Sequence, residues 1–304
     1  MSCNFLKLMV LGCVAAFAAC CAPRQQDATP AYDHVVIIGF DGLAAAHLDT
    51  SACMPFFKSL AEKGAWTFHK RAVLPTWSAT NWSSMFMGVG PDANGYTQWD
   101  SQEPVFTPSD KGPNGVFPTI FTQLRLARPE AESFCAFQWD GIRHVIDSSA
   151  VSKCVLFTES PEGSDAMAEF AASYIIEKKP ELTVLVWDYP DATGHTLGWY
   201  SKDYYDMLPM LDRNLETVVN AITGSDIAGS TLIIVTADHG GHDFGHGTET
   251  DVDLFTPLVF YGPRVKAGEI EGPVYQYDIA ATVASALRLP VPRSWRGRPI
   301  VDAF

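Results

Sequence analysis

The chain has 304 residues, of which 47% are apolar and 18% are charged, which is enough apolar side chain to fill a large core and excludes a disordered tail or a collagen-like fibre. Its formal net charge of −14 gives a surface that repels polyanions, so general binding of nucleic-acid polymers is excluded. An acidic protein that acts on anions needs local positive charge, which metal ions would supply for any phosphate chemistry.

Residues 5–19 form an apolar run that is shorter than a transmembrane helix and ends in small residues, which is typical of an export signal. Phe17-Ala18-Ala19-Cys20 resembles the lipobox of bacterial lipoproteins, although Leu is commoner than Phe at its first position. We predict a lipoprotein signal peptide over residues 1–20 and a polar tether over 21–33. The lipidated residue would be Cys20 or Cys21, and an ordinary cleaved signal peptide is the alternative. The protein is thus expected to be exported, as a periplasmic or cell-envelope lipoprotein of a bacterium held at the membrane by its lipid.

Three cysteines remain outside that leader: Cys53, Cys135 and Cys154. Their spacing does not form a metal-binding motif. An oxidising compartment permits a disulfide, for which Cys135 and Cys154 are the favoured pair, and three isolated thiols are the alternative. We assign no catalytic role to any of them.

From residue 34 onward, buried strands alternate with helices. The segment His34–Phe40 is a β-branched run without polar interruption, typical of a strand buried on both faces of a parallel sheet. Further strands are predicted over 182–188, 231–236 and 256–261, and helices over 54–63, 118–127, 164–178, 201–222 and 276–288. This alternation predicts one α/β domain over residues 34–304, with helices on both faces of the sheet.

Three of the predicted strands end in acidic residues followed by glycine. The first ends in Asp41-Gly42, the second runs into the segment 188–195, which contains Asp188, Asp191 and His195, and the third runs into 238–246. Each alone has a structural explanation, as an Asp-Gly turn or a helix cap. The carboxyl ends of parallel strands meet at one crevice, however, where clustered Asp and His would repel one another or lack partners without cations. Together they predict two divalent ions with three protein ligands each, zinc first and manganese second.

Ser78 lies just ahead of an apolar helical stretch within residues 74–96. A helix N-terminus there would present free N–H groups to an anion. Taken alone, Ser78 is either a helix cap or a nucleophile.

The order of these motifs resembles that of the alkaline phosphatase superfamily, specifically its type I phosphodiesterase/nucleotide pyrophosphatase-like branch, over residues 34–300. The segments that carry the resemblance are Gly39-Phe40-Asp41-Gly42, Pro75-Thr76-Trp77-Ser78-Ala79-Thr80-Asn81, residues 88–95, Pro190-Asp191-Ala192-Thr193-Gly194-His195, Ala237-Asp238-His239-Gly240, Gly245-His246-Gly247, residues 276–283 and residues 296–299. The resemblance implies an alkaline-phosphatase-like three-layer α/β/α fold with a mostly parallel sheet and a small cap insertion.

The resemblance also implies the ligands of the two metal ions. One ion would be held by Asp191, His195 and His246. The other would be held by Asp41, Asp238 and His239, with Ser78 completing its shell. His242 is the alternative to His246, which the neighbouring motif favours.

The implied reaction is hydrolysis of a phosphate ester by in-line attack of a metal-activated Ser78, giving a phosphoseryl intermediate. The side chain of Asn81 and a backbone N–H near Ser78 would bind a phosphate oxygen. The presence of Asn81 and the absence of a Lys-x-Arg pair favour a phosphodiester or a nucleotide pyrophosphate over a phosphomonoester. A sulfatase is less favoured because Ser78-Ala79-Thr80-Asn81-Trp82 lacks the Pro and Arg of a sulfatase motif.

Residues 97–160 lack a clear core pattern and are predicted to form the cap over the site. Aromatic side chains in this segment could grip a small phosphorylated substrate: Trp99, Phe106, Phe117, Phe137 and Trp139. The candidate substrate-binding residues are Trp77, Trp139 and Arg143, the last of which has a surface position as its alternative. Nothing in the sequence marks the phosphosugar site of a phosphomutase. A lipoprotein that only binds an anion would be expected to have lost metal ligands, and none of the expected ligands is missing.

Overall fold

The computed structural model describes residues 29–50 and 52–304. The predicted signal peptide, its lipidated cysteine and most of the tether therefore lie outside the described residues. The strands are β1 His34–Phe40, β2 Ala65–Arg71, β3 Ser133–Phe137, β4 Lys153–Leu156, β5 Leu182–Trp187, β6 Thr231–Ala237, β7 Phe255–Tyr261, β8 Gly268–Glu269 and β9 Val274–Tyr275. The helices are α1 Ala45–Thr50, α2 Pro55–Lys63, α3 Ser78–Met87, α4 Pro91–Asn94, α5 Ile120–Ala127, α6 Ile142–Val145, α7 Pro161–Lys178, α8 Asp191–Leu197, α9 Lys202–Thr223, α10 Asp251–Leu254 and α11 Asp278–Ala286.

The strands form one nine-stranded sheet in the order β4-β3-β5-β1-β6-β7-β2-β8, with β9 paired to β2. Strand β1 lies between β5 and β6 and is parallel to both, so Phe40 is opposite Trp187 on one side and Ala237 on the other. Strand β7 runs antiparallel to both β6 and β2. The register places the last residues of β1, β5 and β6 level with one another at one edge of the sheet, and the predicted mostly parallel sheet is confirmed.

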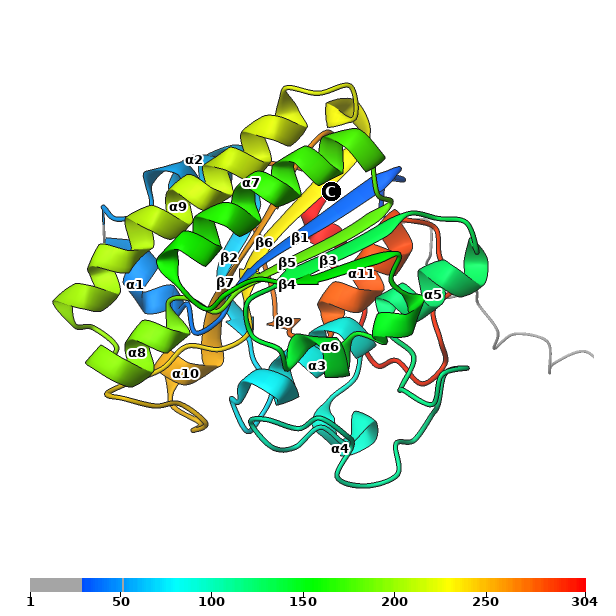
Figure 1. Ribbon diagram of the computed structural model, residues 1–304, viewed down its shortest axis with the longest axis horizontal. Helices are drawn as coiled ribbons and strands as arrows, with labels where there is room; N and C mark the ends of the chain where they lie inside the picture. The colour runs from blue at the N-terminus through cyan, green and yellow to red at the C-terminus, as the bar shows by residue number, and fades with distance from the viewer. Residues whose placement is uncertain (1–28, 51) are drawn as a thin grey trace, which may run out of the picture.

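Helices cover both faces of this sheet (Figure 1). On one face α2, α7 and α9 pack on alternate residues of the strands, including Val36 and Ile38 of β1. On the other face α3, α5 and α11 pack on the residues in between, including Val35 and Ile37. Burial of apolar side chains on both faces explains the uninterrupted apolar runs of the central strands. The three-layer α/β/α arrangement expected from the sequence is confirmed.

The expected cap is the main difference from the sequence-based prediction. Residues 133–137 and 153–156, inside the segment predicted as a cap, are β3 and β4 of the central sheet, and Phe117 and Phe137 are buried in its core. These strands have five and four residues, too short for a periodic pattern to reveal them. The stretch from 95 to 119 has no helix or strand, although Tyr96 and Phe117 within it are buried in the core.

Cys135 and Cys154 are direct neighbours on β3 and β4, as the favoured disulfide required, but both thiols are free, and Cys53 is free as well. The favoured disulfide is thus not present, and the alternative of separate thiols describes the structure. Within residues 29–50 and 52–304, no helix is both long enough and apolar enough to cross a bilayer.

Candidate active site

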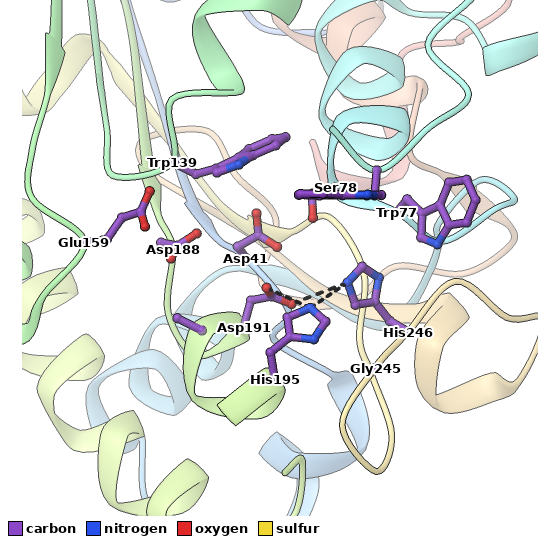
Figure 2. Close-up of a pocket in the computed structure, with 12 residues that line it drawn as sticks. Asp41, Trp77, Ser78, Trp139, Glu159, Asp188, Asp191, His195, Gly245 and His246 are labelled. Atoms are coloured by element: carbon purple, nitrogen blue, oxygen red, sulfur yellow. Dashed lines mark hydrogen bonds and ion pairs between the residues drawn. The ribbon is translucent and has the colours of Figure 1, made fainter. Parts of the chain in front are cut away.

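A cavity of about 540 Å³ opens at the edge of the sheet where β1, β5 and β6 end (Figure 2). Asp41 follows β1, Asp191 begins α8 after β5, and Asp238 and His239 follow β6. His246 comes from the loop between β6 and α10, and Ser78 is the first residue of α3. Segments far apart in the sequence thus deliver their polar side chains to one place, as the parallel topology predicts.

One group of possible metal ligands consists of Asp41, Asp238 and His239, all buried. The Nε2 atom of His239 lies 3.3 Å from Oδ1 of Asp41 and 3.2 Å from Oδ2 of Asp238. Oγ of Ser78 lies 3.1 Å from the same Nε2 atom. The serine predicted as nucleophile is therefore adjacent to the deeper group of ligands.

A second group lies nearer to solvent around Asp191 and His246, and His239 is close enough to join it. Nε2 of His195 is 3.4 Å from Oδ2 of Asp191 and 3.1 Å from Nε2 of His246. Nε2 of His246 is 3.8 Å from Oδ1 of Asp191. The side chain of His195 is 44% exposed, so this second group faces the open side of the cavity.

The hydrogen bonds of the three histidines fix which ring nitrogen faces the cavity. Nδ1 of His239 donates to the carbonyl of Gly240 (2.7 Å), and Nδ1 of His246 donates to that of Thr76 (2.6 Å). Nδ1 of His195 donates to the carbonyl of Phe244 (3.0 Å). A carbonyl only accepts, so each Nδ1 carries a proton and Nε2 is the ring nitrogen that faces the carboxylates. This is the arrangement of metal-binding histidines, whose second nitrogen is held by an outer hydrogen bond.

The carboxylates also lack partners that a cation would supply. Oδ1 of Asp41, Oδ1 of Asp191 and Oδ2 of Asp238 are buried without a hydrogen-bond partner. Burial, followed by the neighbouring carboxylates, raises the pKa of each of these three groups well above its usual value. Burial also lowers the pKa of His246 to about 4, so its ring is neutral at physiological pH. Unpartnered carboxylates beside neutral imidazoles fit two divalent cations.

Several supporting residues were missed by the sequence-based reasoning. Nε1 of Trp82 donates to Oδ2 of Asp41 (2.8 Å), and the amide of Gly42 donates to Oδ1 of Asp238 (3.2 Å). The ammonium of Lys70, fully buried on β2, donates to the carbonyl of Ala237 directly before Asp238 (2.9 Å). Gly42 lies inside a recognised motif and Trp82 directly follows another, whereas nothing in the sequence around Lys70 marks it.

Asp253 joins the loop that carries His246 to the loop that precedes Ser78. Its Oδ1 accepts from Nδ1 of His242 (2.8 Å), and its Oδ2 accepts from the amide of Thr248 (2.9 Å). Oγ1 of Thr76 in turn accepts from the amide of Gly247 (2.9 Å). His242 therefore has Asp253 as its hydrogen-bond partner, and His246 is the histidine that lies among the possible metal ligands.

A substitution at Gly42 tests whether Asp191 belongs to a metal site. Its φ is +70°, and a Cβ atom there would lie 2.8 Å from both Cβ and Oδ1 of Asp191. We expect Gly42→Ala to displace Asp191 and to weaken zinc binding by about 10- to 100-fold, the usual cost of disturbing a supporting contact. Competition with a chromophoric chelator would measure the affinity. Gly229→Ala is the matched control, since nothing lies within 4 Å of its Cβ position, and equal zinc affinity in the two variants would contradict this role for Gly42.

The comparisons with known proteins agree with this site. Residues 35–256, well over half of the chain, match the family described as type I phosphodiesterase / nucleotide pyrophosphatase. The chain belongs to this family. It is 23% identical to a venom phosphodiesterase of Macrovipera lebetinus over 288 residues, which cover 88% of this chain and 32% of that protein. The chain therefore spans about one third of the length of the curated relatives that it matches over most of its own length.

Among solved structures, the alkaline phosphatase PafA superposes with a TM-score of 0.73 at 14% identity, covering 90% of this chain and 99% of that one. Murine ectonucleotide pyrophosphatase/phosphodiesterase 5 superposes with a TM-score of 0.70 at 16% identity, covering 85% and 96% of the two chains. These similarities show an alkaline-phosphatase-like fold for this member of the type I phosphodiesterase family.

Two of the candidate site residues chosen from the sequence, Asn81 and Arg143, are not among the residues that line the cavity. Asn81 is fully buried, its Oδ1 accepts from the amide of Val73 (2.8 Å), and its Nδ2 donates to the carbonyls of Val73, Pro75 and Trp77. It fixes the loop before Ser78, so the expectation that Asn81 binds a phosphate oxygen does not agree with the structure.

Arg143 is exposed, pairs with Asp140 and lies over the ring of Phe137 at 5.8 Å, as a surface residue would. It does not line the cavity, and the structure therefore places it outside the expected substrate site. Trp77 and Trp139, the other two candidate substrate-binding residues, do line the cavity.

Two acidic residues on the cavity wall, Asp188 and Glu159, were not assigned a role from the sequence. Burial, followed by the charge of Glu159, raises the pKa of Asp188 to about 7. The only sequence signal for Asp188 was its place after β5, and Glu159 carried none.

Proposed function

We propose that this protein hydrolyses phosphate esters, diesters in preference to monoesters, with Ser78 as the nucleophile. The observation that carries the proposal is the position of Oγ of Ser78, 3.1 Å from Nε2 of His239, which belongs to both groups of possible ligands. A hydroxyl held at a two-metal centre is suited to attack on a phosphate bound by the same centre. The family to which the chain belongs supports the same chemistry.

Asp41, Asp238 and His239 would hold one divalent ion, and Asp191, His195 and His246 the other. When bound, two such ions lower the pKa of a coordinated hydroxyl and neutralise charge on the phosphate oxygens and on the leaving oxygen. The donor set of carboxylates and neutral imidazoles favours zinc, with manganese as the second choice.

The residues of the chain perform the rest of the reaction. Oγ of Ser78 loses its proton to solvent and attacks phosphorus in line. The bond to the leaving oxygen breaks, and that oxygen departs with the electron pair and takes up a proton from water. The backbone N–H of Ser78, at the N-terminus of α3 and without a partner in the described part of the chain, is placed to donate to an equatorial oxygen. Water then hydrolyses the phosphoserine and regenerates Ser78.

The lining of the cavity favours a phosphodiester over a monoester. No Lys or Arg is among the described residues that line it, so no side-chain cation is available for the extra charge of a monoester dianion. Glu159, and Asp188 in its ionised form, add negative charge to the wall and oppose such a dianion further. The same lining opposes a general polyanion, in agreement with the acidic composition.

We further propose that the enzyme is an exported bacterial lipoprotein that acts at the cell envelope. The apolar run at residues 5–19, followed by Cys20 and Cys21, supports this proposal. Globomycin, an inhibitor of lipoprotein signal peptidase, should cause accumulation of the unprocessed precursor. Normal processing in its presence would instead indicate an ordinary signal peptide.

The activity is tested on three aryl esters with the zinc-loaded protein: a phosphate diester, a phosphate monoester and a sulfate. We expect kcat/KM for the diester to exceed that for the monoester by about 10-fold or more, since one uncompensated charge in a partly closed site costs at least about 1.4 kcal/mol. The sulfate should be the poorest substrate. Monoester turnover above diester turnover would make the protein a phosphomonoesterase, and cleavage of the sulfate alone would make it a sulfatase.

A further inference from the structure

A second cavity, of about 430 Å³, lies between the segment of β9 and the start of α11 on one side and the C-terminal segment on the other. None of the described residues that line it also lines the catalytic cavity. Residues 276–283 and 296–299, two of the segments that carry the family resemblance, contribute to its lining, but the proposed reaction gives them no part. Its volume falls within the range of small-molecule sites.

The floor of this cavity is apolar, and one wall is aromatic. The floor is formed by the buried side chains of Ile270, Val274 and Ile300. On the wall, the rings of Tyr275 and Tyr277 stack with their centroids 5.4 Å apart and an angle of 13° between their planes, and both residues are partly exposed. The negative face of an aromatic ring attracts weakly positive C–H groups of a ligand.

The rim of the cavity is polar, and most of its polar groups lack a partner within the protein. Arg296 is the exception, since its guanidinium is paired with Asp92. The rim groups that make no hydrogen bond or ion pair in the described part of the chain are the guanidinium of Arg298, the carboxylates of Glu271 and Asp302, and the hydroxyls of Tyr275 and Tyr277. The rim therefore offers both hydrogen-bond donors and acceptors to a ligand.

Asp278 ties the aromatic wall to the C-terminal segment. Its Oδ2 accepts from the amide of Tyr275 (2.9 Å), and its Oδ1 accepts from the amide of Arg298 (2.9 Å). Both sides of the cavity are thus joined by hydrogen bonds within the protein. A cavity that is already formed lowers the cost of ordering its walls when a ligand binds.

The lining discriminates between classes of ligand. A phosphate or another anion would find one unpaired guanidinium, that of Arg298, against the carboxylates of Glu271 and Asp302. A purely apolar ligand would cover the polar rim without offering it partners. A neutral pyranose ring matches both parts of the cavity, because it has C–H groups on its faces and hydroxyls at its edge that both donate and accept.

We propose that this cavity is a binding site for a neutral pyranose sugar, separate from the catalytic centre. A C–H face of the sugar lies on the tyrosine wall, and its hydroxyls donate to the carboxylates of Glu271 and Asp302 and accept from the guanidinium of Arg298. The site attaches the domain to a glycan and leaves the catalytic cavity free for its own substrate. The proposal does not depend on the reaction, because the sugar carries no phosphate and no metal ligand lines this cavity.

The test titrates the zinc-loaded protein with the methyl pyranosides of glucose, galactose, mannose and N-acetylglucosamine. Sorbitol is the comparison, since it is a polyol without a ring. Binding is measured by calorimetry and by saturation-transfer NMR of the sugar protons. We expect at least one pyranoside to bind at least about 10-fold more tightly than sorbitol, because only the ring can stack on tyrosine. Equal binding of pyranosides and sorbitol, or binding of none of them, would overturn the proposal. Tighter binding of inorganic phosphate or of glycine than of every pyranoside would overturn it as well.

Substitutions on the wall and the rim locate the bound sugar. Tyr277→Phe keeps the ring and should keep the affinity within about 3-fold, whereas Tyr277→Ala should lower it about 10-fold. Arg298→Gln leaves the wall intact and should lower the affinity at least about 3-fold, which keeps the site testable if Tyr277→Ala is unstable. Tyr200→Ala is the matched control, since Tyr200 is 41% exposed and does not line this cavity, and its sugar affinity should equal that of the wild type. Unchanged affinity in both Tyr277→Ala and Arg298→Gln would place the sugar elsewhere and overturn the site.

Discussion

The Ser78→Ala variant should lose phosphodiester turnover by on the order of 10⁴-fold or more, as happens when the nucleophile of a covalent mechanism is removed. Oγ is the only atom deleted, and it lies at the boundary of the two groups of possible ligands without being one of their carboxylate or imidazole donors. Zinc content and thermal stability should therefore stay close to those of the wild type. Steady-state turnover and elemental analysis on the same preparation measure both.

Ser78→Thr is the matched control for this variant, because it retains a hydroxyl at the first residue of α3. It should keep measurable activity and should form a phosphorylated residue that is detectable by mass spectrometry after rapid acid quenching. If Ser78→Ala instead retained turnover within about 10-fold of the wild type, water would attack phosphorus directly and the covalent route would be wrong.

Removal of the metal ions should abolish activity and lower the melting temperature, and the thermal effect should grow as pH rises. Stabilisation of about 4 kcal/mol by ions at 1,000 times their dissociation constant corresponds to a shift on the order of 10 °C for a domain of this size. The shift is measured by comparing chelated and zinc-loaded protein in thermal scans between pH 5 and pH 8. Zinc added back should restore both activity and melting temperature.

The direction of this pH dependence of the melting-temperature shift follows from the raised pKa values of Asp41, Asp191 and Asp238. Without metal, each of these groups contributes stability that is fully present below the unfolded pKa of 3.8 and is lost as pH rises through its raised folded value. A cation replaces those protons, so metal binding releases protons and strengthens with pH. Lys70, with its pKa lowered to about 7, changes stability in the opposite direction, but it is not among the possible ligands and largely cancels in the comparison. A melting-temperature difference that shrank toward pH 8 would contradict the assignment of these carboxylates as ligands.

Local sequence patterns predicted the centre of the fold and the convergence of the site. Strands β1, β5 and β6 are continuous apolar runs because both faces are covered, and each is followed within four residues by an Asp that reaches the same edge of the sheet. Covalent proximity to a strand end is a local property, so the sequence alone locates Asp41, Asp191 and Asp238. The lateral strands were harder: β2 contains Lys70, whose burial depends on acceptors supplied by β6 and by Gln276.

The substrate side of the cavity could not be predicted in the same way. Glu159 lies two residues before α7 and looks like an ordinary solvated acid. Its segment follows β4, and only the pairing of β4 with β3 and of β3 with β5 brings it beside Asp188. Asn81 shows the opposite case, since its position in a recognised motif suggested contact with phosphate, whereas its amide is used up on three carbonyls of the preceding loop. A motif shows which residue types occur together in the sequence, whereas only the folded structure shows which groups each side chain contacts.

The carboxylate of Asp253 couples two parts of the reaction that are usually considered separately. Through Thr248, Gly247 and Thr76 it fastens the segment bearing His246 to the segment that ends at Ser78. These hydrogen bonds within the protein thus tie the segment that carries His246 to the segment that ends at Ser78. The proposed ions would bind to ligands that these hydrogen bonds already hold in place, so little chain entropy would be lost on metal binding. Substitutions that weaken these hydrogen bonds should alter the alignment of Ser78 with the phosphate before they alter the metal content.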